Sequence, residues 1–484
     1  MRERSLGETT RDLASRAARI LGRAGRRGRQ HLEVFLGGPD RTRVIFLLAA
    51  VLALSSADAA TVGASAIELR QALNINNTDI GLLVAVTSVV AAVASIPFGV
   101  LADRAPRTRT LGICVFLWGG AMVWSATVGS FGKLLLARLF LGIVTAAAGP
   151  IVASLVGDLF SGDERGKIYG YILTGELLGA GIGFAVTGDI AALSWRAAFL
   201  ILAIPAFFLA WFVFHLPEPV RTGGRAPGSF GSFGAPAETD AQRLVRARGI
   251  VPDHAQVAAD PARMGLIDAA RYVLRVRTNV ILIVASAAGY YFLAGVQVFG
   301  VEFVRKQYRV DAALANLLML VIGGGAVIGI LAGGALGDSL LKGGHVNGRI
   351  LVSALAAALA TLLFVPALLT RSLITAVPYV TFAALALSAQ RAPMDAARLD
   401  IMPPPLWGRA EGIRSLLRTG AQALAPLLFG LMSDYVFGGG RSGLQWTFLF
   451  MLLPLGAGTV YLFKALKTYP RDIATAAAAG TVAR

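Results

Sequence analysis

The residues best placed to do chemistry in this sequence are the few ionisable side chains that interrupt long apolar stretches. Asp58 and Arg138 each lie well inside such a stretch. At 1.5 Å per helical residue, Asp58 lies about 21 Å into its stretch, near the middle of a bilayer. A charge is costly there and by default marks a functional site. Because arginine stays protonated in proteins, we interpret Asp58 as the candidate proton carrier.

Five further polar side chains lie inside apolar stretches or close to their ends. Glu176 is a second candidate for proton coupling, and Arg391 with Asp395 forms a closely spaced pair of opposite charge. Glu302 lies near the end of another stretch, with Gln297 one turn deeper. We interpret these last four residues as candidates to line a substrate cavity, because polar groups inside membranes mark substrate and ion paths.

The elements that hold these residues are predicted to be membrane-spanning helices. Of the 484 residues, 56% are hydrophobic and 15% are charged, whereas soluble domains are about 45–50% apolar. The net charge of +17 does not indicate nucleic-acid binding, since Lys and Arg lie almost entirely between the apolar stretches. One cysteine, Cys114, and four scattered histidines predict no disulfide framework, metal site or cofactor. The excess of Arg over Lys is typical of a GC-rich bacterial source.

The hydrophobic pattern predicts an all-α polytopic membrane protein with twelve transmembrane helices, each near or above the roughly 20 residues that cross a bilayer. The predicted spans are 44–69, 77–102, 110–130, 132–157, 168–191, 196–216, 278–304, 311–336, 349–369, 372–397, 408–436 and 442–467. The predicted parts of the chain are a basic arm (1–43), a first six-helix bundle (44–216), a linker with an amphipathic helix (217–277), a second bundle (278–468) and a tail (469–484).

The distribution of bases predicts the orientation of the chain. The arm, every second connection and the tail are rich in Lys and Arg, and such segments stay in the cytoplasm. Both termini are therefore predicted to be cytoplasmic, in the inner or plasma membrane. The opposite connections have few bases, except Arg305, Lys306 and Arg309. The arm is predicted either as an amphipathic helix on anionic membrane lipids or as a disordered tail.

A charged turn between two apolar stretches occurs twice in the chain. Its residues are Gly99, Asp103, Arg104 and Arg107 in the first copy, and Gly334 and Asp338 in the second. The turn resembles the loop signature of the major facilitator superfamily, and its recurrence is typical of a transporter built from two halves. The resemblance implies two pseudo-symmetric six-helix bundles. It also implies a gating role for the turn, whose aspartate can engage the start of a neighbouring helix.

The resemblance further implies which helices are neighbours. The first and fourth helices adjoin in that fold, and Arg138 lies in a segment that resembles the arginine motif of proton-coupled members. Asp58 is therefore expected to pair with Arg138. A static ion pair that only holds two helices together is the alternative.

Glycines at four-residue spacing form one stripe in the fifth span and another in the eighth. They are Gly175, Gly179, Gly183, Gly325, Gly329 and Gly333. Small residues in such stripes let two helices pack backbone to backbone. In the superfamily the fifth and eighth helices meet between the halves, so the stripes are interpreted as the surface on which the bundles rock. Packing inside one half is the alternative.

Within the superfamily, the first half is most similar to the Spinster-type branch, whose members transport lysophospholipids or sphingolipids. The similarity rests on Asp58, Asn76-Asn-Thr-Asp79-Ile-Gly81, Trp118, Arg138, Pro150, Asp158-Leu-Phe160 and Trp195-Arg196-x-x-Phe199. After Gly142 the chain reads Ile-Val-Thr145, where that branch usually has a glutamate. A second carboxylate of the fourth helix is therefore missing.

The expected function is a secondary transporter, acting as a monomer, that moves an amphiphile such as a lysophospholipid on a proton gradient. A multidrug/H⁺ antiporter of the same fold is the close alternative. A membrane-embedded lipid-modifying enzyme is disfavoured, because no suitable catalytic set lies at a membrane boundary. No Gly-x₄-Gly-Lys-Ser/Thr phosphate loop appears, which disfavours direct use of ATP.

Overall fold

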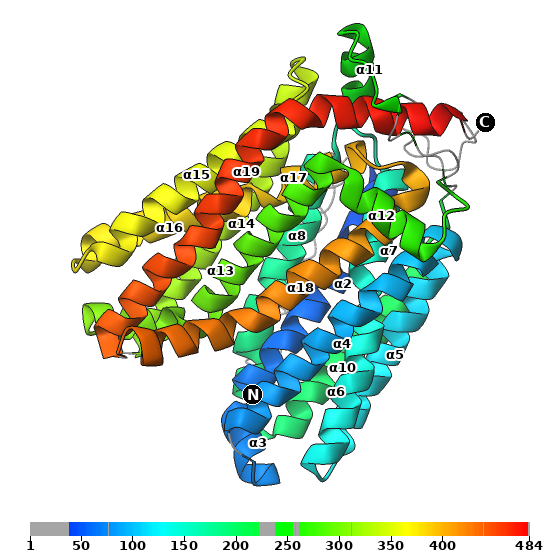
Figure 1. The fold of residues 1–484 in the computed structure, drawn as a ribbon. Helices are drawn as coiled ribbons and strands as arrows, with labels where there is room; N and C mark the ends of the chain where they lie inside the picture. The colour runs from blue at the N-terminus through cyan, green and yellow to red at the C-terminus, as the bar shows by residue number, and fades with distance from the viewer. Residues whose placement is uncertain are drawn as a thin grey trace, which may run out of the picture. The chain divides into compact units, whose positions relative to one another are not determined.

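The computed structural model describes residues 38–75, 77–219, 221, 238–254, 257, 261–310, 312–438 and 440–482. Within these ranges all regular structure is helical (Figure 1), which confirms the predicted all-α class. Most of the predicted basic arm, residues 1–37, lies outside the described residues, as does the glycine- and proline-rich part of the linker at 222–237.

The long helices lie in two series, one on each side of the linker in the sequence. The first series is α2 (Pro39–Ala64), α3 (Ala66–Leu73), α4 (Asn77–Arg104), α5 (Arg107–Thr127), α6 (Phe131–Thr145), α7 (Ala148–Leu159), α8 (Arg165–Ile182), a π-helical turn (Gly183–Thr187), α9 (Gly188–Leu193) and α10 (Trp195–Phe214). The second is α13 (Arg277–Tyr308), α14 (Ala312–Lys342), α15 (Gly348–Leu369), α16 (Leu373–Ala389), α17 (Arg391–Asp400), α18 (Trp407–Leu431), a π-helical turn (Met432–Val436) and α19 (Gly440–Val482). Helix α19 continues well beyond residue 467, where the twelfth span was predicted to end.

The fourth and tenth predicted spans are each interrupted at an equivalent point. Helix α6 stops at Thr145 and α7 resumes at Ala148, with Pro150 as its third residue. Helix α16 stops at Ala389 and α17 resumes at Arg391, with Pro393 as its third residue. A proline ring clashes with the carbonyl four residues earlier and lacks an N–H, so it breaks the helix one turn upstream. The shared break supports a duplicated ancestry of the two halves.

Ten helices in the described part of the chain are long and apolar enough to cross a membrane. The predicted fifth and eleventh spans, seen as α8 and α18, are helical but are not among these ten. Both helices have shorter uninterrupted apolar stretches than the other ten, because they contain several charged residues. These include Glu176 in α8 and Glu411 and Arg414 in α18. Ion pairs satisfy these charges inside the protein, as described below.

The two series meet mainly along α4 with α18 and α8 with α14 (Figure 1), and also where α7 contacts α18 and α8 contacts α17. A Cβ atom added at Gly99 of α4 would lie 2.7 Å from the carbonyl oxygen of Gly408 of α18. A Cβ atom added at Gly166 of α8 would lie 2.8 Å from the carbonyl oxygen of Gly334 of α14. The halves therefore touch backbone to backbone at two equivalent points, which only glycine permits.

The predicted glycine stripes do not form this interface, and the alternative interpretation is correct. Gly179 faces the backbone of Ala53 in α2, and Gly329 faces the backbone of Leu385 in α16. The other stripe residues follow the same two faces, Gly175 and Gly183 toward α2 and Gly325 and Gly333 toward α16. The stripes therefore pack helices inside each half. The physical reason is rotation about the helix axis: Gly166 and Gly334, which do meet across the halves, lie on other faces of α8 and α14.

The linker forms two helices where the structure describes it. Helix α12 (Leu266–Arg275) occupies the predicted amphipathic segment, with Ala269, Tyr272 and Val273 buried and the apolar Ile267 exposed. Helix α11 (Asp240–Ala247) was not predicted. It begins with a capping box, in which Thr239 and Gln242 each bond the other's backbone N–H. That Thr-x-x-Gln spacing was the sequence signal for its start.

Candidate functional site

Asp58 and Arg138 form a buried ion pair between α2 and α6. Arg138 Nη1 lies 2.9 Å from Asp58 Oδ1, and the two residues are 1% and 4% exposed. The guanidinium carbon of Arg138 also lies 4.6 Å from the centre of the Phe199 ring of α10. Among the described residues, Nε and Nη2 of Arg138 have no hydrogen-bond partner. One carboxylate thus faces an arginine whose donors are only partly used.

The electrostatics of this pair restrict the conditions under which Asp58 could bind a proton. Protonating Asp58 would remove its negative charge and leave the Arg138 charge uncompensated in a dry setting, which is strongly unfavourable. The protonated form therefore requires water or another anion beside Arg138, and each becomes available only if the surrounding helices move.

A second group of charges joins the halves further along the chain. Arg391, the first residue of α17, lies 2.8 Å from Glu176 of α8 and also donates to the hydroxyl of Tyr290 of α13. Glu176 was predicted as a proton-coupling residue and Arg391 as a cavity residue. The structure brings both into one ion pair across the two halves.

Asp395 belongs to a neighbouring network between α17 and α18. Its carboxylate lies 2.8 Å from Arg414, which in turn lies 2.9 Å from Glu411. Glu411 also forms an ion pair with Arg398. All four residues are at most 5% exposed. Sequence reasoning missed Arg398 and Glu411 and assigned Arg414 to a connecting turn; the i, i+3 spacing of Asp395 with Arg398 and of Glu411 with Arg414 was the available signal.

A pocket opens onto both of these charge groups. The cavity itself has a volume of about 20 Å³, room for about one water molecule. Its polar lining comprises Ser286, Tyr290, Ser388, Gln390, Arg391, Asp395 and Arg414, and its apolar lining comprises Ala285, Leu293, Leu387 and Met394. Gln297 is exposed on α13 and does not line this pocket. Glu302 is in α13 as well, and its side chain lies outside the described residues.

Asp103 connects the end of α4 to the start of α18. Its carboxylate accepts hydrogen bonds from the backbone N–H groups of Gly408 (2.7 Å) and Arg409 (3.0 Å) and from Arg409 Nε (2.7 Å). A carboxylate is favoured there because a helix N-terminus has unsatisfied N–H groups and a positive dipole end. The Gly-x-x-x-Asp turn of the first half is therefore bonded to the second half.

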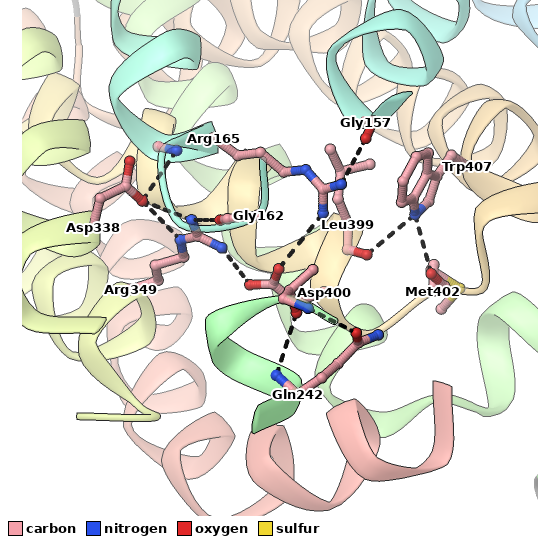
Figure 2. Close-up of polar contacts among 12 residues, drawn as sticks. Gly157, Gly162, Arg165, Gln242, Asp338, Arg349, Leu399, Asp400, Met402 and Trp407 are labelled. Carbon is pink, nitrogen blue, oxygen red and sulfur yellow. Dashed lines mark hydrogen bonds and ion pairs between the residues drawn. The ribbon is translucent and has the colours of Figure 1, made fainter. Parts of the chain in front are cut away.

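Asp338 makes the equivalent connection from the second half to the first (Figure 2). Its carboxylate accepts hydrogen bonds from the backbone N–H groups of Gly166 (3.2 Å) and Lys167 (2.7 Å) at the start of α8. Arg349 lies 2.7 Å from Asp338 and 2.5 Å from Asp400, and Arg165 lies 3.9 Å from Asp400. Figure 2 shows this row of side chains of alternating charge, which extends from one half to the other.

Arg107 and Arg104 have different roles from the two aspartates. Arg107 is fully buried and forms an ion pair with Asp158 inside the first half. Arg104 is exposed and donates to the carbonyl of Met264 in the linker at 2.9 Å. Arg107 is thus the counterpart of Arg349, since each starts the helix after the turn and binds the aspartate that ends the following span. Sequence reasoning named Arg107 but missed Arg349.

Glu218 supports the first-half turn from just beyond α10. Its carboxylate lies 2.8 Å from both Arg107 Nε and the Thr108 backbone N–H, and 2.9 Å from the Thr108 hydroxyl. Partial burial raises the pKa of the Glu218 carboxyl, but the hydrogen bonds from Thr108 and Arg107 outweigh burial and hold the pKa below its usual value. The carboxylate is therefore the stable form at neutral pH.

Comparison with known proteins finds one matching family and several distant relatives. The family model of the Major Facilitator Superfamily matches residues 46–386. The chain is 26% identical over 216 residues to protein spinster of Drosophila melanogaster, covering 44% of the chain and 35% of that protein. It is 31% identical over 160 residues to the quinolone resistance protein NorA of Staphylococcus aureus, covering 31% and 40%. The chain thus aligns with less than half the length of these curated relatives.

Solved structures show the same fold at low identity. The human organic anion transporter MFSD10 superimposes with a TM-score of 0.64 at 18% identity, covering 88% of this chain and 99% of that one. A bacterial homolog of the human lysosomal transporter Spinster, inward-facing and unoccupied, superimposes with a TM-score of 0.58 at 19% identity, covering 90% and 98%. At these identities the likeness concerns the fold.

Proposed function

Because the chain belongs to the major facilitator superfamily and is a transporter of the multi-pass membrane type, we propose that it is a proton-coupled secondary transporter of an amphiphilic or lipid-like substrate. A lysophospholipid is the first candidate. The similarity to protein spinster and to the fold of a bacterial Spinster homolog supports this choice. Alternating access between the two halves would expose the substrate pocket to each side of the membrane in turn.

The observation that supports proton coupling is the buried Asp58–Arg138 pair. In a resting ion pair the carboxylate is held by a single guanidinium nitrogen at 2.9 Å. When the surrounding helices separate and water enters, Asp58 can exchange a proton without leaving Arg138 in a dry setting. Asp58 thus carries the proton and Arg138 holds the deprotonated form.

The hydrogen bonds that join the two halves at one end correspond to one state of the proposed transport cycle. Asp103 and Asp338 both cap helices of the opposite half, and glycine backbones touch beside them. In the proposed orientation this end faces the cytoplasm, so the state is closed on the inside. Opening to the inside requires both aspartates to leave the helix starts that they cap.

The test is uptake into proteoliposomes with labelled lysophosphatidylcholine, with and without an imposed pH gradient. Asp58→Asn keeps the shape of the side chain and removes its titration. We expect this variant to fold and to exchange substrate without a gradient, but to lose accumulation driven by the pH gradient. Conserved accumulation in the variant would contradict the role of Asp58 and would direct attention to Glu176, Glu302 or Asp395.

The alternative function is a multidrug/H⁺ antiporter of the same fold, favoured by the similarity to a quinolone resistance protein. The same proteoliposomes distinguish the two functions when they are loaded with a cationic dye. Dye movement against its gradient, with no lysophosphatidylcholine uptake, would favour the antiporter.

A further inference from the structure

Two arginines share one aromatic ring at the pocket between α13, α17 and α18. The guanidinium carbons of Arg391 and Arg418 lie 4.4 Å and 4.5 Å from the centre of the Tyr290 ring. Arg391 and Tyr290 line the pocket. Both cations are attracted to the ring electrons, but the ring provides no negative charge.

The charges around this ring do not balance. Glu176 binds Arg391, whereas Asp395 and Glu411 bind Arg398 and Arg414. Arg418 makes no ion pair with any residue that the structure describes. The group of four arginines and three carboxylates therefore has one excess positive charge. An unpaired charge in a membrane protein interior is costly unless an anion or water can reach it.

Hydrogen-bond donors of the same two arginines are unused. Over the described ranges of the chain, no partner is found for Nε and Nη1 of Arg391 or for Nε of Arg418, and all three atoms are buried. The side chain of Arg391 is 10% exposed. Planar guanidinium groups of this kind bind carboxylate and phosphate oxygens through paired donors.

We propose that the Arg391–Arg418–Tyr290 group binds the anionic head group, a phosphate or carboxylate, of the transported amphiphile. This inference rests on the proposed transport function and assigns the substrate class. Leu293, Leu387 and Met394 line the same pocket, so an apolar chain would meet hydrophobic side chains beside the charged end once the two halves separate and the pocket widens.

Glu176 competes with this anion for Arg391. It comes from α8 of the first half, whereas Arg391 belongs to the second half, and its side chain is 25% exposed. An incoming anion that takes over Arg391 releases Glu176 and breaks a bridge between the halves. Substrate binding and separation of the halves are thereby linked at one guanidinium group.

The test measures binding to the purified full chain in detergent by calorimetry. The probes are oleoyl lysophosphatidate, neutral oleoylglycerol with the same chain, and glucuronate, a small anion without a chain. Arg391→Gln and Arg418→Gln are each expected to weaken lysophosphatidate binding about 10- to 100-fold, the effect of losing a charged hydrogen bond. Oleoylglycerol binding should stay unchanged. Glucuronate binding that matches lysophosphatidate would contradict the amphiphile and identify a small acid as the ligand.

Glu176→Gln is expected to change the affinity for lysophosphatidate in the opposite direction. It removes the competing carboxylate, so it should strengthen lysophosphatidate binding several-fold, and the double variant Glu176→Gln/Arg391→Gln should bind as weakly as Arg391→Gln. The double variant also leaves no buried carboxylate unpaired if the single Arg391 variant fails to fold. Arg371→Gln, at an exposed arginine in a connecting loop, is the matched control and should bind normally.

Two results would overturn the anion site. One is normal lysophosphatidate binding by Arg391→Gln or by the double variant. The other is an equal loss of lysophosphatidate and oleoylglycerol binding, which would mean that the arginines only shape the pocket. Neither result depends on a gradient, so failure of the anion site is distinguished from failure of Asp58 as the proton site.

Discussion

At the scale of single residues, several buried arginines of the described chain are each stabilised by a specific carboxylate. Arg138 binds Asp58, Arg107 binds Asp158, and Arg349 binds both Asp338 and Asp400. An isolated ion would not tolerate such burial, whereas a paired and hydrogen-bonded one does. These pairs each lie within one half. The pair of Arg391 with Glu176 joins the halves and would have to separate in the proposed transport cycle.

Glu218 allows a prediction about pH. A carboxyl whose pKa is lowered by folding stabilises the protein above its usual pKa, and this contribution is lost as the pH falls through the lowered value. Glu218→Gln should therefore lower the melting temperature at pH 7, by an amount equivalent to about 1 kcal/mol or less because the side chain is partly exposed. The difference from the unaltered protein should shrink as the pH falls below the usual pKa of a glutamate.

Melting curves from pH 3 to pH 8 check this expectation. Asp268→Asn, on the exposed side of α12, serves as the control variant and leaves the contacts of Thr108 and Arg107 intact. A difference between Glu218→Gln and the unaltered protein that grows as the pH falls would contradict the assignment.

At the scale of elements, glycines divide into two sets with different neighbours. Gly179 and Gly329 meet backbone inside their own half, whereas Gly166 and Gly334 meet each other across the halves. Close backbone contact inside a half must persist throughout transport. Contact between the halves must break and re-form.

Leucine substitutions separate these two sets. Gly329→Leu has to displace the Leu385 backbone and should destabilise the second half by about 1–3 kcal/mol or more, seen as low monodispersity and a low melting temperature. Gly334→Leu should leave each half folded but prevent closure of this end. Size-exclusion profiles and transport rates, measured for both variants, distinguish a folding defect from a transport defect. Poor folding of Gly334→Leu with normal folding of Gly329→Leu would reverse the assignment.

At the scale of the whole molecule, two equivalent connections close one end. Asp103 of the first half caps α18 of the second, and Asp338 of the second half caps α8 of the first. Each half therefore provides one aspartate and one helix start. This reciprocity follows from duplication. It also means that removing one connection leaves the other in place.

Spin labels test the two connections as a pair. Labels at the exposed positions 109 and 345, in a Cys114→Ala background, report the distance between the halves at this end. Asp103→Asn should broaden the distances modestly, because an amide retains one acceptor oxygen but loses the charge. Asp103→Asn with Asp338→Asn should shift the population to longer distances. An unchanged distribution in the double variant would show that other contacts hold this end closed.

The orientation is tested by labelling single cysteines from outside the cell in the same background. A cysteine at the exposed Gly129 should react with a membrane-impermeant maleimide, and one at the exposed Gly343 should not, because bases favour the cytoplasmic side. The opposite pattern of labelling would invert the proposed topology.

The sequence by itself determined the helical class, the repeat and the positions of its two aspartates. Apolar stretches of about 20 residues report a helix directly, since the bilayer sets their length. The repeated charged turn also predicted that Asp103 and Asp338 lie near the ends of their helices. The helix breaks near Pro150 and Pro393 also have a local cause, although the predicted spans ran through both positions without interruption. All of these features depend on residues close together along the chain.

Only the tertiary structure decided which helix each side chain faces. The pairing of Glu176 with Arg391, the shared ring of Tyr290 and the partners of the glycine stripes all join segments that are far apart in the sequence. Helical periodicity states that residues share a face but leaves open which neighbour covers it. The rotation of each helix about its axis is set by packing against all its neighbours at once, so no single stretch of sequence contains it.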